Sequence, residues 1–437
     1  MEERKPVNKY YLYGTIALIL MIFASYIVNV NIVVLFAVIA VCAMIFFADI
    51  KTATCVLFLF SAFSYIVVYS RISLIVIVAV VYIFKVILQY RMSVAFIFFS
   101  CFVFGYCMLF NDATVAFSLG NIISIVLFLL MGTVCCVVKT EDFTDVFNWY
   151  ICGFIIASVM GMFVQQIPAL AAISNINYLS MGDYTTKQNM YDTVRYAGLS
   201  YDPNFFSLSS YVIVATILFR SKERLKLSEL LLILFITVLG FFTYSKSYLL
   251  AIALVYIVYF FQNDKDFLKR FVGGIILIVL FLVIEKALNL NVTTNLMRRF
   301  ETGQASGDLT TGRTDLWEEY IEYIFSNVRY LFFGKGYDAL SLRKAAHNTF
   351  IEYFYHFGII GIIVWFTYFS VCYSTVKVNS AKNFRKTNKM PMIMLLAGVF
   401  FLNTFRFEHT WLLLCVAFYS SKTPVIQKRK EVLLCQN

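Results

Sequence analysis

The chain of 437 residues is 61% hydrophobic and only 14% charged, and its mean hydropathy is +0.79. This balance excludes a water-soluble globular protein and indicates a polytopic membrane protein without a soluble domain. The net charge of +11 reflects the placement of basic residues between membrane segments, and nucleic-acid binding is not needed to explain it.

Apolar runs recur along almost the whole chain, from Tyr10 to Phe418. Each is about 15 to 22 residues long, which is enough for a helix to cross a bilayer core of roughly 30 Å. We therefore predict an all-α polytopic protein, a single integral membrane domain over residues 1–437 with about fourteen transmembrane helices and a range of twelve to fourteen. The predicted spans are centred near residues 19, 40, 61, 80, 101, 128, 157, 212, 235, 254, 280, 362, 398 and 414.

Lysine and arginine gather in every second segment between the predicted spans. If the spans simply alternate, one side of the membrane receives 22 of the 36 basic residues, so this side is cytoplasmic and holds both termini. The other side receives two long loops, Pro168–Pro203 and Asn289–Ala346. Neither loop is strongly basic, so an anion site there depends on a few placed arginines.

The first long loop ends in the sequence RYAGLSYDPN, from Arg195 to Asn204. Asp202 suits the N-cap of the next helix and Pro203 its first position, where the missing N–H costs nothing. Taken alone, this sequence is only a helix start. Arg195 adds a guanidinium beside the free N–H groups of that helix, and together these groups form a candidate anion site.

The second long loop contains two arginine-bearing segments, Asn295–Phe300 with Arg299 and Thr311–Trp317 with Arg313. From Thr314 onward, apolar side chains recur at helical spacing and acidic residues occupy the first turn. We predict an amphipathic helix lying on the membrane surface, with Thr314 as its N-cap and Arg313 at its start. The simpler alternative for Arg313 is an ion pair with a neighbouring acid.

Three further basic segments follow or precede predicted spans on the outer side. Lys246 comes after the ninth span and Arg406 after the thirteenth, where snorkelling and a local pair with Glu408 are the simpler explanations. The sequence FGKGY, Phe333–Tyr337, places two glycines beside a lysine. This pattern is compatible with a phosphate cradle, although a turn that returns the chain to the membrane is the simpler interpretation.

His347 stands at the outer end of the twelfth predicted span. On a helix it shares one face with Gly358 and Gly361, which permit close approach of a neighbouring helix, so we expect His347 to point into the bundle. Its imidazole can accept a proton from a hydroxyl group, and a hydrogen bond to a backbone carbonyl is the simpler alternative. Glu352 lies deeper and should be paired or line a cavity. For His356 we predict a structural hydrogen bond.

Four motifs in this order resemble the O-antigen ligase and polymerase superfamily. They are Arg195-x-x-Gly198 with Asp202-Pro203-Asn204, Thr243-x-Ser-Lys246, Thr311-Gly312-Arg313 with Trp317, and His347-Asn348-Thr349 with Gly358-x-x-Gly361. The resemblance covers about residues 190–375, and the first half of the chain matches in hydropathy alone. It implies a GT-C-like fold with a dozen or so spans and a large outer loop.

The resemblance further implies a glycosyltransferase embedded in the bacterial inner (cytoplasmic) membrane, with its active site on the extracytoplasmic side. The donor would be an oligosaccharide on undecaprenyl diphosphate and the acceptor a sugar hydroxyl, so a growing polysaccharide chain is a further partner. Transfer would invert the anomeric centre and need neither a metal nor another cofactor. The lipid bilayer, a chain-length regulator and a flippase complete the implied partners, and nucleic acid is not among them.

The same resemblance assigns roles to residues. His347 would be the catalytic base or the group that orients the attacking hydroxyl, while Arg313 and Arg195 would bind the diphosphate of the leaving group. The family often has arginine where this chain has Lys246. A lysine binds an anion as a point charge, so a bidentate contact is not expected there. No Cys, His or Asp cluster has metal-ligand spacing, so no metal site is predicted. Our own predictions for substrate binding, beyond the roles that the resemblance implies, are Asn348, Lys246, Asn204, Arg299, Glu352 and Arg406.

Three functions remain open at this level. A polymerase adds the chain to another lipid-linked repeat unit, and we favour it. A ligase moves the finished chain to lipid A core or another acceptor by the same chemistry. A transporter or flippase of lipid-linked oligosaccharides is the alternative from a different class. It should carry ionisable residues near the middle of several spans, for which the candidates are Lys85, Glu285, Lys286, Glu352 and His356.

Overall fold

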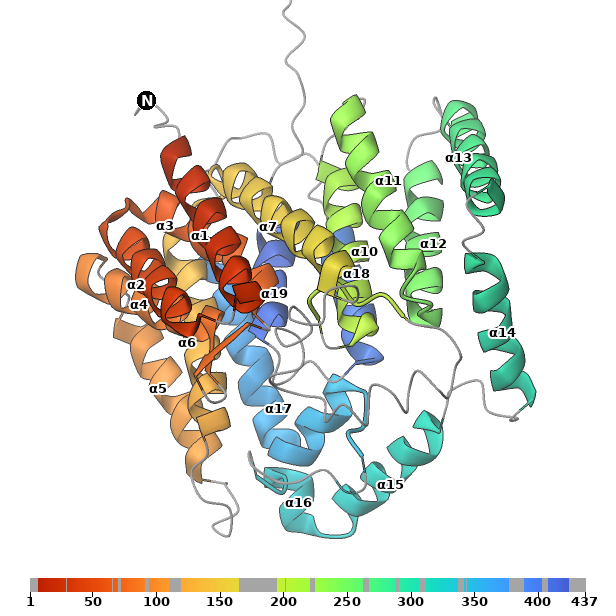
Figure 1. Cartoon of the computed structure of the whole chain (residues 1–437). Helices are drawn as coiled ribbons and strands as arrows, with labels where there is room; N and C mark the ends of the chain where they lie inside the picture. Colours follow the sequence, from red (N-terminus) through yellow and green to blue (C-terminus); the bar gives the residue numbers. More distant parts are fainter. Residues whose placement is uncertain are drawn as a thin grey trace, which may run out of the picture.

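The structure is a computed structural model of the chain (Figure 1). It describes residues 7–28, 30–64, 66–69, 72–90, 94–109, 119–164, 195–200, 202–220, 225–261, 267–287, 291–305, 312–336, 342, 344–376, 389–402 and 408–423. Helices account for most of these residues, as the sequence predicts.

The N-terminal part of the chain is a run of apolar helices connected by short segments. They are α1 (Lys9–Val28), α2 (Asn31–Phe47), α3 (Ile50–Phe60), α4 (Leu74–Gln89), α5 (Val94–Leu109), α6 (Leu119–Val137) and α7 (Phe143–Val164). The third predicted span is shorter than expected, because a 3-10 turn, η1 (Ser61–Phe63), ends it. An antiparallel hairpin follows, formed by β1 (Val67–Tyr69) and β2 (Ile72–Ser73), where β-branched and aromatic residues favour extended backbone.

The C-terminal part holds the long predicted loops as well as apolar helices. Its elements are α10 (Pro203–Arg220), α11 (Leu227–Phe241), α12 (Lys246–Phe261), α13 (Phe267–Ala287), α14 (Val292–Ala305), α15 (Arg313–Phe325), α16 (Val328–Phe333), α17 (Thr349–Thr375), α18 (Met390–Phe400) and α19 (Glu408–Lys422). The second long loop therefore contains α14 and α16 in addition to the one helix that the sequence predicted there.

Every predicted span centre falls on a helix, the third one on η1. Among the described residues, α1, α17 and the segment Phe143–Phe163 of α7 are long and apolar enough to cross a membrane, and seven other apolar helices are shorter. The chain is therefore a helical membrane protein. The count of fourteen crossings, their alternation and the GT-C-like arrangement stay predictions.

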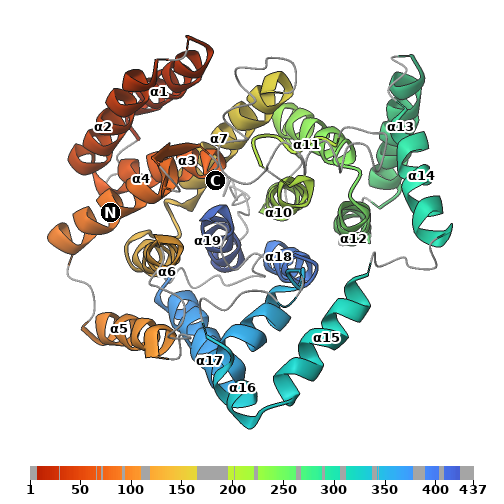
Figure 2. The same ribbon diagram turned by 60° about the horizontal axis from the view of Figure 1, so that its bottom comes forward.

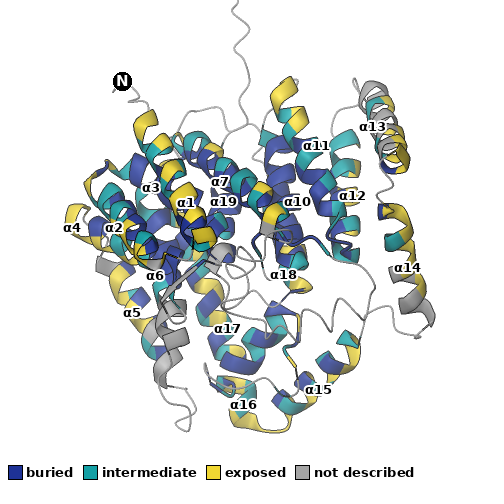
Figure 3. Ribbon diagram, in the orientation of Figure 1, coloured by how far each residue is buried: buried dark blue, intermediate teal, exposed yellow. Residues whose placement is uncertain are grey.

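The core lies around α10 and α19. Figure 2 shows α19 near the middle of the bundle, with α6, α10, α17 and α18 around it. Every residue of α10 from Phe205 to Phe219 is buried, and α19 is almost as enclosed, as Figure 3 shows in dark blue. A largely apolar helix lies either against lipid or in a protein core, and these two helices lie in the core. These two helices therefore form the buried centre around which the other helices pack.

The peripheral helices expose large apolar side chains. Phe36 of α2 is 62% exposed and Phe98 of α5 is 72% exposed, and yellow faces cover α1, α2, α4 and α5 in Figure 3. Apolar surface on this scale is costly in water and is expected where helices face lipid hydrocarbon. These faces agree with a membrane protein.

Helix α15 departs from the prediction in two ways. It begins at Arg313, with Gly312 as N-cap at φ 76°, so Thr314 is inside the helix and is not its cap. A left-handed cap favours glycine because it has no Cβ. The apolar stripe of Leu316, Tyr320 and Ile324 is buried as its spacing predicts, but it packs against protein, including α17. The position of this helix on the membrane surface stays a prediction.

Candidate active site

The side chain of Arg195 is hydrogen-bonded to a residue at the N-terminus of α10. Its Nε donates to the carbonyl of Thr243 at 2.8 Å and its Nη2 to Oδ1 of Asn204 at 3.3 Å. Asp202 accepts the backbone N–H of Asn204 at 2.8 Å, and α10 begins at Pro203, so the predicted helix start is confirmed. A half-buried guanidinium thus lies beside a helix N-terminus that favours anions.

A second helix N-terminus meets the first at this point. The hydroxyl of Ser245 donates to Oδ1 of Asn204 at 2.8 Å, and α12 begins at the next residue, Lys246. Lys246 is half-buried. A lysine at a helix N-terminus opposes the helix dipole, and an anion bound there would offset this cost. Arg195, Asn204 and Lys246, which are distant in sequence, therefore gather at the paired ends of α10 and α12.

Arg313 lies near the same helix end. Burial lowers the pKa of its guanidinium, and the carboxylate of Asp202 acts on it in the opposite direction. An arginine remains protonated near neutral pH in either case. Asp202, at the start of α10 beside which Arg195 is fixed, therefore acts on Arg313 by its charge.

The chain that leaves α18 connects Arg313 to the start of α17. Arg313 Nη1 donates to the carbonyl of Phe401 at 3.1 Å, and the hydroxyl of Thr349 donates to the next carbonyl, that of Leu402, at 2.6 Å. Thr349 is two residues after His347. The second arginine and the histidine segment are therefore held by adjacent peptide groups.

His347 is the exposed residue of a fixed turn. The residues on either side of it are buried, Ala346 at 0% and Asn348 at 2% exposure, whereas His347 is exposed. Its φ of 50° lies in the left-handed region, which is uncommon for residues other than glycine. Such strain persists only where the surrounding structure maintains it, and it is frequent at functional sites.

The predicted orientation of His347 is wrong. Asn348 is the N-cap of α17, and its Oδ1 accepts the N–H groups of Phe350 and Ile351. His347 therefore precedes the helix and has no helical face. In addition, α17 is interrupted at Gly358, where φ is 62° and ψ is −171°, so the predicted face does not continue through the helix.

The interruption of α17 is covered by the sequence FGKG that precedes it. The N–H groups of Lys335 and Gly336 donate to the carbonyls of Tyr355 and His356 at 2.8 and 3.0 Å. The hydroxyl of Tyr106 donates to the next carbonyl at 2.8 Å. These amides satisfy carbonyls that a broken helix leaves without partners, so the turn interpretation of this sequence is supported and the phosphate cradle is not. The ammonium of Lys335 lies 4.8 Å from the centre of the Tyr323 ring.

Glu352 and His356 form a buried pair one helical turn apart. Oε2 of Glu352 is 3.2 Å from Nε2 of His356, and Oε1 accepts the backbone N–H of Ala346 at 2.6 Å. Nδ1 of His356 lies 2.9 Å from the carbonyl oxygen of Gly336. Both carboxylate oxygens thus have protein partners, which disfavours the predicted substrate contact of Glu352. The predicted structural hydrogen bond of His356 is confirmed.

The match to known families lies over this region. Residues 230–366 match the family model described as O-antigen ligase. This match supports the similarity of the region to the O-antigen polymerase and ligase superfamily. No curated protein and no solved structure matches the chain. Glycosyl transfer of the O-antigen ligase or polymerase type is therefore the broad class of its activity.

The O-antigen ligase domain contains most of the predicted site. Lys246, Arg313, His347, Asn348 and Glu352 lie within residues 230–366. The segment with Arg195 and Asn204 lies before the matched region and joins it through the contacts with Thr243 and Ser245. Only the tertiary structure unites the two parts.

Two predicted substrate-binding residues are not placed. The side chain of Arg299, on α14, and the whole of Arg406 lie outside the described part of the chain. Within the described ranges, no three His, Cys, Asp or Glu side chains come together as metal ligands do.

Sequence reasoning did not assign functions to several groups of the site. Ser245 has no feature that separates it from other serines near helix ends, although its position before Lys246 is a weak signal. The carbonyls of Phe401, Leu402 and Thr243 act through the backbone, so residue identity cannot reveal them. Trp317 is part of the resemblance, yet its contact with residue 346 needs the fold.

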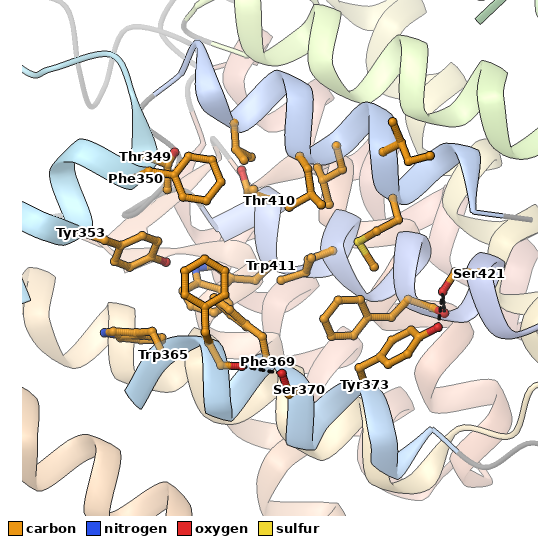
Figure 4. Close-up of a pocket in the computed structure, with 18 of the residues that line it drawn as sticks. Thr349, Phe350, Tyr353, Trp365, Phe369, Ser370, Tyr373, Thr410, Trp411 and Ser421 are labelled. Carbon is orange, nitrogen blue, oxygen red and sulfur yellow. Dashed lines mark hydrogen bonds between the residues drawn. The ribbon is translucent and has the colours of Figure 1, made fainter. Parts of the chain in front are cut away.

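An apolar cavity of about 500 Å³ begins beside the site and runs between α17, α18 and α19. Figure 4 shows Thr349, Phe350 and Tyr353 at one end and Tyr373 and Ser421 at the other. Its walls are mostly aromatic and aliphatic. The end at Thr349 is two residues from His347 in the sequence.

Proposed function

We propose that the chain polymerises lipid-linked polysaccharide repeat units of the O-antigen or capsule type. It transfers a glycan from undecaprenyl diphosphate to a sugar hydroxyl of another lipid-linked unit, at the outer face of the bacterial cytoplasmic membrane. The observation that carries this proposal is a hydrogen bond of 2.7 Å from Nε1 of Trp317 to the carbonyl of Ala346. It connects the helix that begins at Arg313 to the residue before His347.

The arginines act on the leaving group. Arg195 and Arg313 lie beside the N-terminus of α10, and Lys246 begins the adjacent α12. Fixed cations and helix N-termini stabilise negative charge without reorganisation during reaction. This arrangement is suited to a diphosphate whose charge increases as its bond to the sugar breaks.

His347 acts on the acceptor. Its imidazole takes the proton of the acceptor hydroxyl, whose oxygen attacks the anomeric carbon of the donor. The bond from that carbon to the diphosphate oxygen breaks, and its electron pair leaves with undecaprenyl diphosphate. The imidazolium then releases its proton to water, and the new glycosidic bond has inverted configuration.

The apolar cavity supports a lipid-linked donor. It extends along α17 from Thr349 to Ser374 and is lined largely by side chains such as Trp365, Phe369 and Leu396. A hydrocarbon chain gains by burial against such a surface, while its charged head remains at the end where the arginines lie.

Purified protein with lipid-linked repeat units as the only substrate separates polymerase from ligase. A ladder of products supports the polymerase. Products that form only after lipid A core or another acceptor is added support the ligase and contradict the polymerase.

The transporter alternative needs ionisable groups that substrate or ions can reach. Lys85 instead donates to the carbonyls of Phe46 and Ala48, and Glu285 accepts the N–H and hydroxyl of Thr293 at 2.5 Å each. These pairings favour structural roles. Transport of lipid-linked sugar by a His347→Ala variant that forms no glycosidic bond would overturn the enzyme proposal.

A further inference from the structure

The backbone of Ala346 is hydrogen-bonded at both its N–H and its carbonyl, which belong to successive peptide groups. Its N–H donates to Oε1 of Glu352 at 2.6 Å, and its carbonyl accepts from the indole of Trp317 at 2.7 Å. Ala346 and Glu352 are 0% and 1% exposed, so water does not compete for these bonds. The backbone on the N-terminal side of His347 is therefore fixed by two side chains.

The contact of His356 with Gly336 decides which of its two ring nitrogens faces Glu352. A carbonyl oxygen only accepts, so Nδ1 of His356 carries a hydrogen toward Gly336. The other nitrogen, Nε2, lies 3.2 Å from Oε2 of Glu352. Glu352 is therefore oriented by His356. His356 is held in turn by its contact with the carbonyl of Gly336, beside the interruption of α17 at Gly358.

We propose that Glu352 is a positioning residue for His347, held by His356 and acting through the amide of Ala346. This assignment of a role for Glu352 in glycosyl transfer rests on the proposed function of His347. The geometry links three features: the chain at Gly336, the buried pair, and the left-handed backbone of His347 at φ 50°. Loss of the carboxylate should free the turn without removing the base.

Two substitutions separate positioning from a direct role. In Glu352→Gln, the amide oxygen still accepts from Ala346 and the amide NH₂ donates to Nε2 of a neutral His356, so both bonds remain. In Glu352→Leu, the volume is similar and both bonds are lost. Glu322→Gln and Glu322→Leu, at an exposed position of α15, are the matched controls.

Amide hydrogen exchange of the purified full-length protein tests the geometry without any substrate. We expect the Ala346 amide to exchange slowly in the wild type and in Glu352→Gln, and roughly tenfold faster in Glu352→Leu. Equal exchange in all three proteins would overturn the proposal. Because no glycan is used, this result is independent of the proposed function.

Turnover of lipid-linked repeat units tests the consequence. Glu352→Leu should lower kcat by about tenfold or more with little change in the KM for the donor, whereas Glu352→Gln should retain most of kcat. If glutamine loses as much activity as leucine, Glu352 acts directly as a charge and the positioning role is wrong. If Glu352→Leu does not fold, Glu352→Gln alone still tests the proposal, because a loss of about tenfold or more in its kcat would overturn it.

Discussion

Trp317 donates the hydrogen of its indole nitrogen to the carbonyl of Ala346 at 2.7 Å, across 29 residues of sequence. Trp317 lies one turn after Arg313 on α15, and Ala346 immediately precedes His347. The arginine expected to bind the diphosphate and the histidine expected to accept the proton are therefore placed by the same helix. Four predictions follow from this arrangement and its surroundings.

Removal of this hydrogen bond should misplace His347. In Trp317→Phe the ring can still pack against Phe400, 5.6 Å away between ring centres, but the buried carbonyl of Ala346 loses its donor. We expect the free energy of unfolding to fall by about 1–3 kcal/mol and kcat to fall by about tenfold. Trp149→Phe on α7 is the control for loss of a buried indole. Equal effects of the two substitutions on kcat would contradict the prediction.

Arg313→Lys should lose most activity although it keeps the charge. Lysine provides a point charge, whereas the guanidinium can donate to Phe401 and to a substrate oxygen together. We expect kcat for the lipid-linked donor to fall by at least about tenfold. Arg329→Lys, at an exposed position of α16, is the control. Turnover near that of the wild type in Arg313→Lys would refute the simultaneous donation to Phe401 and to a substrate oxygen.

Asn204→Asp should weaken donor binding while preserving the local geometry. A carboxylate oxygen can accept from Arg195 and Ser245 as the amide oxygen does, but its charge neutralises the anion site. We expect the KM for the diphosphate donor to rise by about tenfold, with a smaller change in kcat. Asn148→Asp is matched, because Oδ1 of Asn148 also accepts from an arginine, Arg220, at 3.5 Å. An unchanged KM in Asn204→Asp would argue against an anion at this position.

Gly358→Ala should destabilise the protein. A Cβ at this residue would meet the carbonyl of Phe332 at 2.4 Å, and its φ of 62° is unfavourable for alanine. We expect a loss of about 1–3 kcal/mol or more in the free energy of unfolding, measured by thermal unfolding in detergent. Gly273→Ala on α13 meets nothing within 4 Å and should be neutral or slightly stabilising. A similar melting temperature for both variants would show that the break in α17 is not tightly packed.

Sequence reasoning was accurate where the determining interactions are local. The start of α10 at Pro203 follows from Asp202 as cap, and the buried stripe of Leu316 and Tyr320 follows from helical spacing. Hydrophobicity alone placed a helix at each predicted span centre. These features depend on residues within one or two turns of each other, so their signals are present in a short stretch of sequence.

The errors concern residues whose surroundings come from distant parts of the chain. His347 was given a helical face, but Asn348 caps α17 one residue later and Gly358 interrupts it. Glu352 had no assigned partner, since the amide of Ala346 and the position of Gly336 depend on how the chain returns to α17. Several of the partners are backbone groups, which carry no residue-specific signal.

The sequence by itself determined that this is a helical membrane protein with a region similar to O-antigen ligases, because hydropathy and short polar motifs are properties of local sequence. Tertiary structure alone decided which of those motifs meet. Arg195 reaches the N-terminus of α10 and the carbonyl of Thr243, and Trp317 binds the residue before His347. Such contacts are formed by backbone groups brought together by packing, and only the folded chain defines their positions.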